Sequence, residues 1–286
     1  MDSVRYEDGR GFPILDDIQL TFTERKVYGI ISTDEDDQTR LAQLLAGFFL
    51  PTAGEIHYGL ETVKSYDQQV HHRPLFRKIG YVSKDGIGDF LYSTVYEELA
   101  NPIHQYHYRE QELEKRVLDA LKMVALPSEY LYRDPFTLSR GEQKKLALAV
   151  ALICNPAVLI LEEPMLGLDR YEQNKLCVLL RKLKNRYHKT ILIFSKQIDS
   201  VFSLLDEVVI LHQHTVLLTG PKYQVFRDTR KLKKIGIPIP NLIAFSDMVL
   251  KKKHIKMGYR DQINDLIKDI YRYAEWGCGS HGNDQN

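Results

Sequence analysis

Two short segments of the chain carry the residues best suited to phosphate chemistry. The first runs from Leu138 to Lys145 and contains, in order, Ser139, Arg140, Gly141 and Glu142. A hydroxyl group and main-chain N–H groups at the start of a helix bind anions such as phosphate. The same residues also fit a purely structural capping box, in which Ser139 caps the helix and Glu142 reaches back to it. This segment alone leaves both interpretations open.

The second segment follows a short apolar run, Val158–Leu161, and contains Glu162, Glu163 and, after a Gly-Leu step, Asp169. Carboxylates at the carboxyl end of a buried parallel strand lie where α/β folds bind their ligands. Phosphoryl transfer uses one carboxylate to hold a metal ion and another to orient water. Taken singly, either glutamate is better explained as part of a solvated turn between a strand and a helix.

These segments need a sheet to position them, and the apolar pattern predicts one. Buried strands are predicted at 27–31, 157–161, 190–194 and 207–211, with helices at 109–124, 141–153 and 170–185 between them. Shorter β segments, among them 14–22, precede the first of these strands. Strands that alternate with helices predict an α/β fold with a parallel sheet covered on both faces.

The composition is that of an ordinary globular protein and excludes several classes. The chain has 286 residues, of which 44% are hydrophobic and 27% charged, and its net charge is +1. This balance excludes disordered and collagen-like chains and argues against a dedicated nucleic-acid binder. The three cysteines are widely separated, so neither a disulfide framework nor a zinc site is predicted. The longest apolar stretch, 146–161, is too short to cross a bilayer, and we expect a reduced cytosolic protein.

Together, and in this order, the two segments resemble the ATP-binding subunits of ABC transporters. That family carries a Leu-Ser-Gly-Gly-Gln signature, then a Walker B strand that ends in Asp-Glu-Pro, then a Gly-Leu-Asp D-loop. The spacing from Ser139 to Glu162 matches the family, and Tyr6 stands where the family stacks adenine on an aromatic ring. The resemblance implies that Ser139, Arg140, Gly141, Glu142 and Asp169 belong to an ATP site.

The resemblance covers nearly the whole chain and implies its domain organisation. It places an ABC ATPase domain at 1–220, built from a RecA-like parallel sheet, an antiparallel β subdomain and a helical subdomain at about 84–150. A small C-terminal extension at 221–286, with a disordered end, follows. In the extension, four apolar residues at helical spacing predict either packing on the chain's own core or a dimer contact: Ile263, Leu266, Ile267 and Ile270.

The loop that should bind phosphate departs from the family pattern. The family reads Gly-x-x-Gly-x-Gly-Lys-Ser-Thr, whereas residues 32–39 read STDEDDQT. Glycines let successive N–H groups converge on a phosphate, and the lysine meets the β- and γ-phosphates. Here Gln38 replaces the lysine, and only Thr39 keeps a hydroxyl that suits magnesium. We expect an acidic, solvated surface turn, with little or no nucleotide bound at this chain's own site.

Three further positions differ from the family, and one matches it. Lys84 stands at the Q-loop glutamine and Lys196 at the switch histidine, although a lysine cannot act as both donor and acceptor as imidazole does. Glu162 replaces the Walker B aspartate and, with Thr39, remains a candidate magnesium ligand. Glu163 matches the catalytic glutamate.

In the family, the phosphate loop, the Q-loop residue and the switch residue converge on the γ-phosphate. The two lysines at the last two positions are therefore expected either to be solvated independently or to pair with a nearby carboxylate. The candidate carboxylates are Asp36, Asp37, Glu162 and Glu163.

One branch of the family fits best, the energy-coupling factor ATPases of cobalt- and vitamin-type importers. Residues 84–95 (KDGIGDFLYSTV) align without gaps to that branch, although Gly86 and Asp89 differ, and residues 220–226 and 232–240 resemble its tail. The branch implies two ATPase subunits under a transmembrane scaffold subunit and an exchangeable substrate-binding membrane subunit. It also implies a peripheral position on the cytoplasmic side of the membrane.

Each ATP in this family lies between the phosphate loop of one chain and the signature of the other. The differences at the phosphate loop, the Q-loop and the switch position therefore affect this chain's own ATP site and leave the donated signature unaffected. The chain is expected to donate its signature to the ATP and Mg²⁺ of a second, intact ATPase subunit while its own site stays inactive. Two alternatives remain: an active homodimeric ABC ATPase, and a non-catalytic scaffold subunit derived from a P-loop ATPase.

Overall fold

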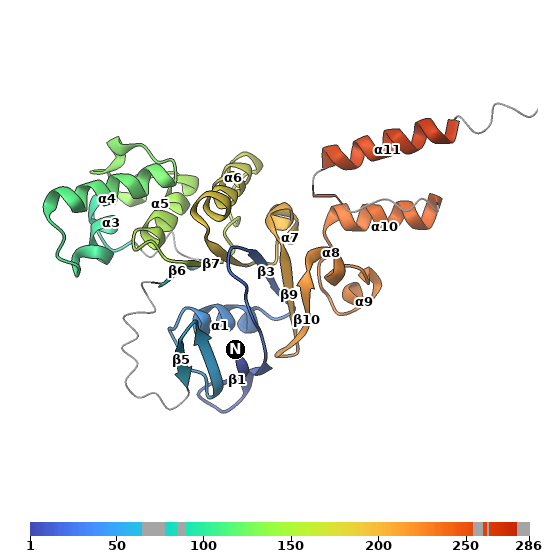
Figure 1. Ribbon diagram of the computed structural model, residues 1–286, viewed down its shortest axis with the longest axis horizontal. Helices are drawn as coiled ribbons and strands as arrows, with labels where there is room; N and C mark the ends of the chain where they lie inside the picture. The colour runs from blue at the N-terminus through green and yellow to red at the C-terminus, as the bar shows by residue number, and fades with distance from the viewer. Residues whose placement is uncertain (65–77, 85–89, 254–259, 262, 279–286) are drawn as a thin grey trace, which may run out of the picture.

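The computed structural model describes residues 1–64, 78–84, 90–253, 260–261 and 263–278 (Figure 1). It has a six-stranded sheet, a four-stranded antiparallel sheet and helices around them, which confirms the predicted α/β fold. Gly86 and Asp89 of the branch-specific segment, and the predicted disordered end at 279–286, lie outside the described residues.

The larger sheet has the strand order β10-β9-β3-β8-β7-β6. Five strands run parallel, and β10 lies antiparallel at one edge. Their bounds are Val27–Ser32 (β3), Ile79–Val82 (β6), Val158–Glu162 (β7), Thr190–Phe194 (β8), Glu207–His212 (β9) and Thr215–Pro221 (β10). The four predicted buried strands are therefore confirmed, and the carboxyl ends of β3, β6, β7 and β8 share one edge.

Alternate residues of the central strand β3 point into two different cores. Val27 and Ile31 belong to the core shared with the helical part of the chain, whereas Tyr28 and Ile30 belong to the core beneath the smaller sheet. This alternation is the two-residue period of an extended strand. The sheet is thus buried on both faces, as its uninterrupted apolar strands predict.

The smaller sheet has the order β2-β1-β4-β5 and supplies the predicted antiparallel β subdomain. Its strands are Asp2–Glu7 (β1), Pro13–Ile18 (β2), Ala53–Tyr58 (β4) and Glu61–Lys64 (β5). Helix α1 (Glu35–Leu45) connects β3 to this region and packs its apolar face, including Leu41 and Leu44, into the second core. Figure 1 shows α1 between the two sheets.

Helices gather on the other side of the large sheet (Figure 1). They are Val95–His104 (α3), Glu110–Met123 (α4), Arg140–Leu152 (α5), Arg170–Tyr187 (α6) and Ile198–Val201 (α7), with 3₁₀ turns at Ser128–Tyr130, Pro135–Thr137 and Phe202–Leu204. The chain turns between α3 and α4, where His107 adopts a φ of 52°. The amphipathic helix predicted at 109–124 is confirmed as α4.

The C-terminal part adds four helices beyond β10. They are Lys222–Val225 (α8), Thr229–Lys234 (α9), Asn241–Lys253 (α10) and Ile263–Cys278 (α11). On α11, Leu266 is buried, as the core interpretation predicts, while the other three residues of the apolar stripe remain exposed. The dimer contact therefore stays a prediction for those three. Within the described ranges, no helix combines the length and apolarity that crossing a membrane requires.

Candidate functional site

The site lies where the parallel strands end. Residues at or beyond the carboxyl ends of β3, β6, β7 and β8 surround one small cavity with room for about one water molecule. Its lining consists of Glu35, Gln38, Thr39, Lys84, Glu162, Glu163 and Phe194. The fold therefore brings together the residues that the resemblance assigns to the phosphate loop, the Q-loop and the Walker B strand.

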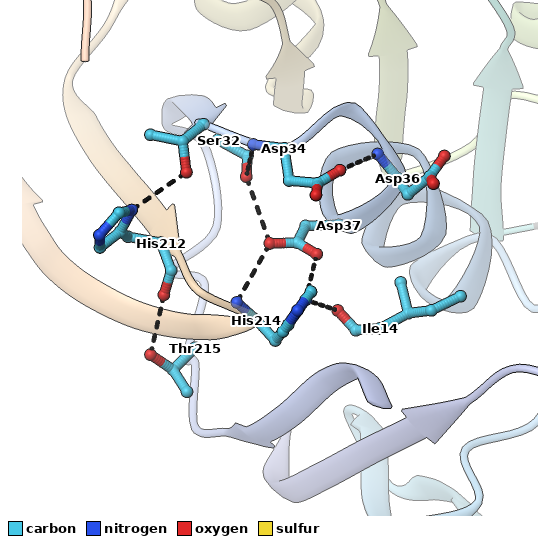
Figure 2. A network of polar contacts seen from close by, with 9 residues as sticks. Ile14, Ser32, Asp34, Asp36, Asp37, His212, His214 and Thr215 are labelled. Atoms are coloured by element: carbon cyan, nitrogen blue, oxygen red, sulfur yellow. Dashed lines mark hydrogen bonds and ion pairs between the residues drawn. The ribbon is translucent and has the colours of Figure 1, made fainter. Parts of the chain in front are cut away.

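The segment expected to be an acidic surface turn is the first turn of a helix. Helix α1 begins at Glu35, and Asp34 caps it by accepting a hydrogen bond of 2.8 Å from the backbone N–H of Asp36. The backbone N–H of Asp34 donates in turn to Ser32 Oγ at 3.0 Å (Figure 2). Two N–H groups at the position of the phosphate cradle therefore bind the chain's own side chains.

Asp37, in the same turn, is not solvated, which corrects the expectation for this residue. Its side chain is fully buried, and its carboxylate lies 2.8 Å from His214 Nδ1 and accepts a hydrogen bond from the backbone N–H of His214 (Figure 2). Burial raises the pKa of Asp37, and the hydrogen bond to this carboxylate raises the pKa of His214. His214 lies in the turn directly before the edge strand β10, and no sequence signal identifies it as a partner.

Gln38, at the position of the phosphate-binding lysine, points back into the sheet. Its amide donates a hydrogen bond of 2.6 Å to the carbonyl of Ile30, and the residue is buried. In the next turn, the Arg40 guanidinium lies over the Tyr6 ring, 4.8 Å from the ring centre, and 4.4 Å from that of Phe49. The aromatic ring expected to stack on adenine therefore has one face covered by an internal cation.

Glu35 joins the two lysines that replace the Q-loop and switch residues. One carboxylate oxygen lies 2.8 Å from Lys84 Nζ, and the other lies 2.9 Å from Lys196 Nζ. These contacts lower the pKa of Glu35 to about 2, the hydrogen bond from Lys196 having the largest effect. The expected pairing of lysine with carboxylate is present, but the shared acid is Glu35, which was not among the four candidates.

Glu163, at the catalytic-glutamate position, is held by the segment that follows β8. Its carboxylate accepts hydrogen bonds from Ser195 Oγ at 2.8 Å and from the backbone N–H of Lys196 at 2.7 Å. Its backbone has a φ of 41°, and its carbonyl accepts a hydrogen bond from Lys144 Nζ. Burial lowers the pKa of Lys144 to about 8. Glu162, one residue earlier, is buried at the end of β7.

The signature segment forms the N-terminus of helix α5 and does not line the small cavity. Ser139 and Glu142 make a complete capping box, with Ser139 Oγ 2.8 Å from Glu142 Oε2. Tyr130 donates a further hydrogen bond to Glu142, and Ser139 itself is exposed. The capping-box interpretation is confirmed, and the exposed hydroxyl remains available to a second chain only if it exchanges this contact.

The rest of the signature packs against the D-loop within the same chain. A Cβ atom at Gly141 would come within 2.7 Å of Glu172 Oε2, and a Cβ atom at Gly167 would come within 3.1 Å of Arg140 Nη1. Gly167 also has a φ of 75°, which favours glycine. Asp169 caps helix α6 by accepting a hydrogen bond from the backbone N–H of Glu172. Arg140 therefore lies beside the D-loop.

Comparison with known proteins places this geometry in a family. The family model described as ABC transporter matches residues 15–166. The chain is 25% identical over 269 residues to the energy-coupling factor transporter ATP-binding protein EcfA2 of Bacillus thuringiensis, with 92% of each chain covered. It is 24% identical to EcfA2 of Caldanaerobacter subterraneus, with 83% of this chain and 82% of that protein covered.

The comparison with solved structures leads to the same family. The chain resembles CbiO1 from Clostridium perfringens, described as part of the ABC transporter complex CbiONQ, with a TM-score of 0.72 and 25% identity. The match covers 86% of this chain and 97% of that one. The dimeric ABC cassette MJ0796 has the same fold, with a TM-score of 0.65 and 23% identity.

Proposed function

The chain belongs to the ABC transporter family, and on this premise we propose that it is an ATP-binding-cassette subunit of an energy-coupling factor importer. In this proposal it supplies its signature segment to the ATP site of a second, intact ATPase subunit and does not hydrolyse ATP itself. The similarity to EcfA2 proteins and to CbiO1 over most of the chain supports the type of importer.

The contacts in the phosphate loop support the loss of this chain's own nucleotide site. A bound triphosphate needs free N–H groups and a cation for its β- and γ-phosphates. Here Asp34 and Ser32 accept the hydrogen bonds of the loop, and Gln38 binds the sheet. The residues present do not fit Mg–ATP, because Glu35 lines the phosphate end of the site and Gln38, at the position of the phosphate-binding lysine, is buried against Ile30.

The single observation that carries the proposal is the position of Glu35 between Lys84 and Lys196. In the family, a terminal phosphate lies where this chain has the Glu35 carboxylate. Groups that bind magnesium or orient water lie where this chain has the two lysines. Like charge opposes both parts of the ligand: the carboxylate opposes phosphate, and the ammonium groups oppose Mg²⁺. The site is therefore proposed to bind no nucleotide or to bind it weakly.

The exposed N-terminus of α5 supports the donated signature. Ser139 and the backbone N–H groups of the first turn can contact a phosphate carried by another chain. Arg140 adds a guanidinium group beside them, which suits phosphate. Glu142 must release Ser139 for this contact, since its carboxylate now accepts the Ser139 hydroxyl.

The proposed partners follow from the same assignment. They are an intact ABC ATPase subunit, a transmembrane scaffold subunit and an exchangeable substrate-binding membrane subunit, with ATP and Mg²⁺ at the site shared with the first. The chain is then peripheral to the cytoplasmic side of the membrane, and nucleic acid has no part in its function.

One observation favours a second candidate function, a scaffold without any role in ATP hydrolysis. The complete capping box gives Ser139 and Glu142 a structural role that needs no phosphate. A scaffold of this kind would leave the ATPase rate of the complex unchanged when the signature is altered.

Purification of the chain with and without its ATPase partner tests the proposal. Isothermal titration calorimetry and phosphate release are measured on this chain, on the partner and on the complex. We expect no ATPase activity in this chain and a higher rate in the complex than in the partner alone. Activity of the isolated chain would favour the homodimeric ATPase, and equal rates for partner and complex would favour the scaffold.

A further inference from the structure

Glu35, Lys84 and Lys196 form a three-residue bridge between segments that are far apart in the sequence. Glu35 is the first residue of α1, Lys84 follows β6, and Lys196 follows β8. Each carboxylate oxygen of Glu35 contacts a different ammonium group, at 2.8 Å and 2.9 Å. The bridge therefore connects three loops at one edge of the sheet through a single anion.

We propose that the Glu35 carboxylate is a built-in substitute for a bound phosphate, which keeps Lys84 and Lys196 together without any nucleotide. The inference rests on the proposed function in one respect, namely that this loop holds no ATP. It adds that the loop is not merely inactive: it carries its own anionic ligand, and the connection between the three segments does not require a nucleotide.

The surroundings of Glu35 hold the carboxylate in place from both sides. On its own helix, Asp34 caps the first turn, and buried Asp37 binds His214, so the backbone around Glu35 is fixed. On the opposite side, the backbone N–H of Lys196 donates to Glu163, which fixes the base of that lysine. The backbone is therefore fixed on both sides of the bridge, and mainly the two lysine side chains can still change conformation.

The bridge contributes little to the free energy of unfolding, because its three side chains are exposed. Its effect comes from where it places the charges. Side-chain exposure is 51% for Glu35, 37% for Lys84 and 50% for Lys196. Exposed ion pairs are screened by solvent and are individually weak. A single carboxylate that neutralises two ammonium groups nevertheless removes the repulsion between them and leaves no anion site open to an external ligand.

Removal of the Glu35 charge should therefore uncover an anion site. In the full-length chain, Glu35→Gln keeps the size of the side chain but leaves Lys84 and Lys196 without the shared carboxylate. Asp36→Asn is the matched control, since Asp36 is an exposed acid in the same helical turn. The probe is inorganic tripolyphosphate without magnesium, titrated by calorimetry at low ionic strength.

We expect Glu35→Gln to bind tripolyphosphate at least about tenfold more tightly than wild type and Asp36→Asn, since the ammonium groups of Lys84 and Lys196 are then no longer neutralised by Glu35 and attract a polyanion. Hydrogen exchange supplies a second readout that needs no ligand. Amides 195–197 should exchange about fivefold faster in Glu35→Gln, the size expected when weak exposed ion pairs are lost, and should be unchanged in Asp36→Asn.

Equal behaviour of the two variants in both measurements would overturn the role of Glu35 and leave the proposed function intact. Micromolar binding of Mg–ATP by the wild-type chain would overturn the proposed function instead. Circular dichroism of both variants checks that each is folded before the comparison is made.

Discussion

The buried carboxylate of Asp37 lies 2.8 Å from Nδ1 of His214, a residue 177 positions further along the chain. Asp37 belongs to the turn where a phosphate loop would lie, and His214 lies in the turn directly before the edge strand β10. An aspartate at this position would repel a phosphate, yet here it supports the fold by joining two distant segments. Asp37 therefore has a structural role in this turn.

This pair should make stability depend on pH. Because the pKa of His214 is raised above 6.5, its contribution to the free energy of unfolding is fully present below that pH and is lost as the pH rises through the raised value. Burial also raises the pKa of Asp37, so its ionised form is penalised as the pH rises, and Asp34 raises both pKa values further. The stability that this pair contributes should therefore fall as the pH rises from 6.5, the ordinary pKa of histidine.

Urea unfolding of wild type and of Asp37→Asn from this pH upward isolates the pair. The difference between the two proteins cancels the opposing titration of Lys144, whose pKa is lowered. Wild type should lose stability relative to Asp37→Asn as the pH rises, whereas His212→Gln should follow wild type. A difference that is constant with pH would contradict the assignment.

The isolated chain should not bind ATP more tightly than about millimolar, which corresponds to roughly −4 kcal/mol. The reason is that Asp34 and Ser32 already accept the hydrogen bonds of the loop and that Glu35 occupies the phosphate end of the site. Calorimetry with Mg–ATP measures this directly, and the intact partner subunit serves as the positive control. Micromolar binding would show that the loop rearranges around the nucleotide.

In the complex with the partner, Ser139→Arg should reduce the ATPase rate by about tenfold or more, because it removes a hydroxyl group and crowds a phosphate site. Glu163→Gln should matter much less, since Glu163 binds Ser195 and the Lys196 backbone on the side of the inactive site. Steady-state phosphate release measures both. The reverse ranking would show that the active site is on this chain.

The tail offers a matched pair of substitutions on one helix. Leu266 is 4% exposed, so Leu266→Ala should lower the free energy of unfolding of the tail by about 2 kcal/mol or more. Ile267 is 41% exposed, and Ile267→Ala should cost less than about 1 kcal/mol. Urea unfolding followed by far-UV circular dichroism measures both effects. Equal effects would mean that α11 does not pack through Leu266.

The strands could be predicted because their signal is local. Runs such as Val27–Ile31 and Thr190–Phe194 are apolar throughout, and such runs form buried parallel strands wherever they lie in the chain. Their order in the sheet also placed Glu162, Glu163 and Lys196 at one edge. The convergence of the predicted site residues is a consequence of that topology.

The contacts inside the site could not be predicted in the same way. Asp34 has the residue type of a helix cap, and that local signal indicates an earlier start for α1 than the loop of the family suggests. Asp37 contacts His214, and Tyr6 contacts Arg40. Both contacts depend on how distant segments pack and on which rotamers the side chains adopt. The spacing of residues along the sequence does not predict these contacts.

The early start of α1 makes the change in this loop difficult to reverse. Replacing Gln38 by lysine alone would bury an ammonium group where an amide now binds the sheet, and an unpaired buried charge is costly. Replacing Asp34 by glycine would remove the cap of α1 while Glu35 still bridged the lysines. Neither substitution alone restores a phosphate loop without loss, so the residues of this helical turn are linked by epistasis and would have to change together.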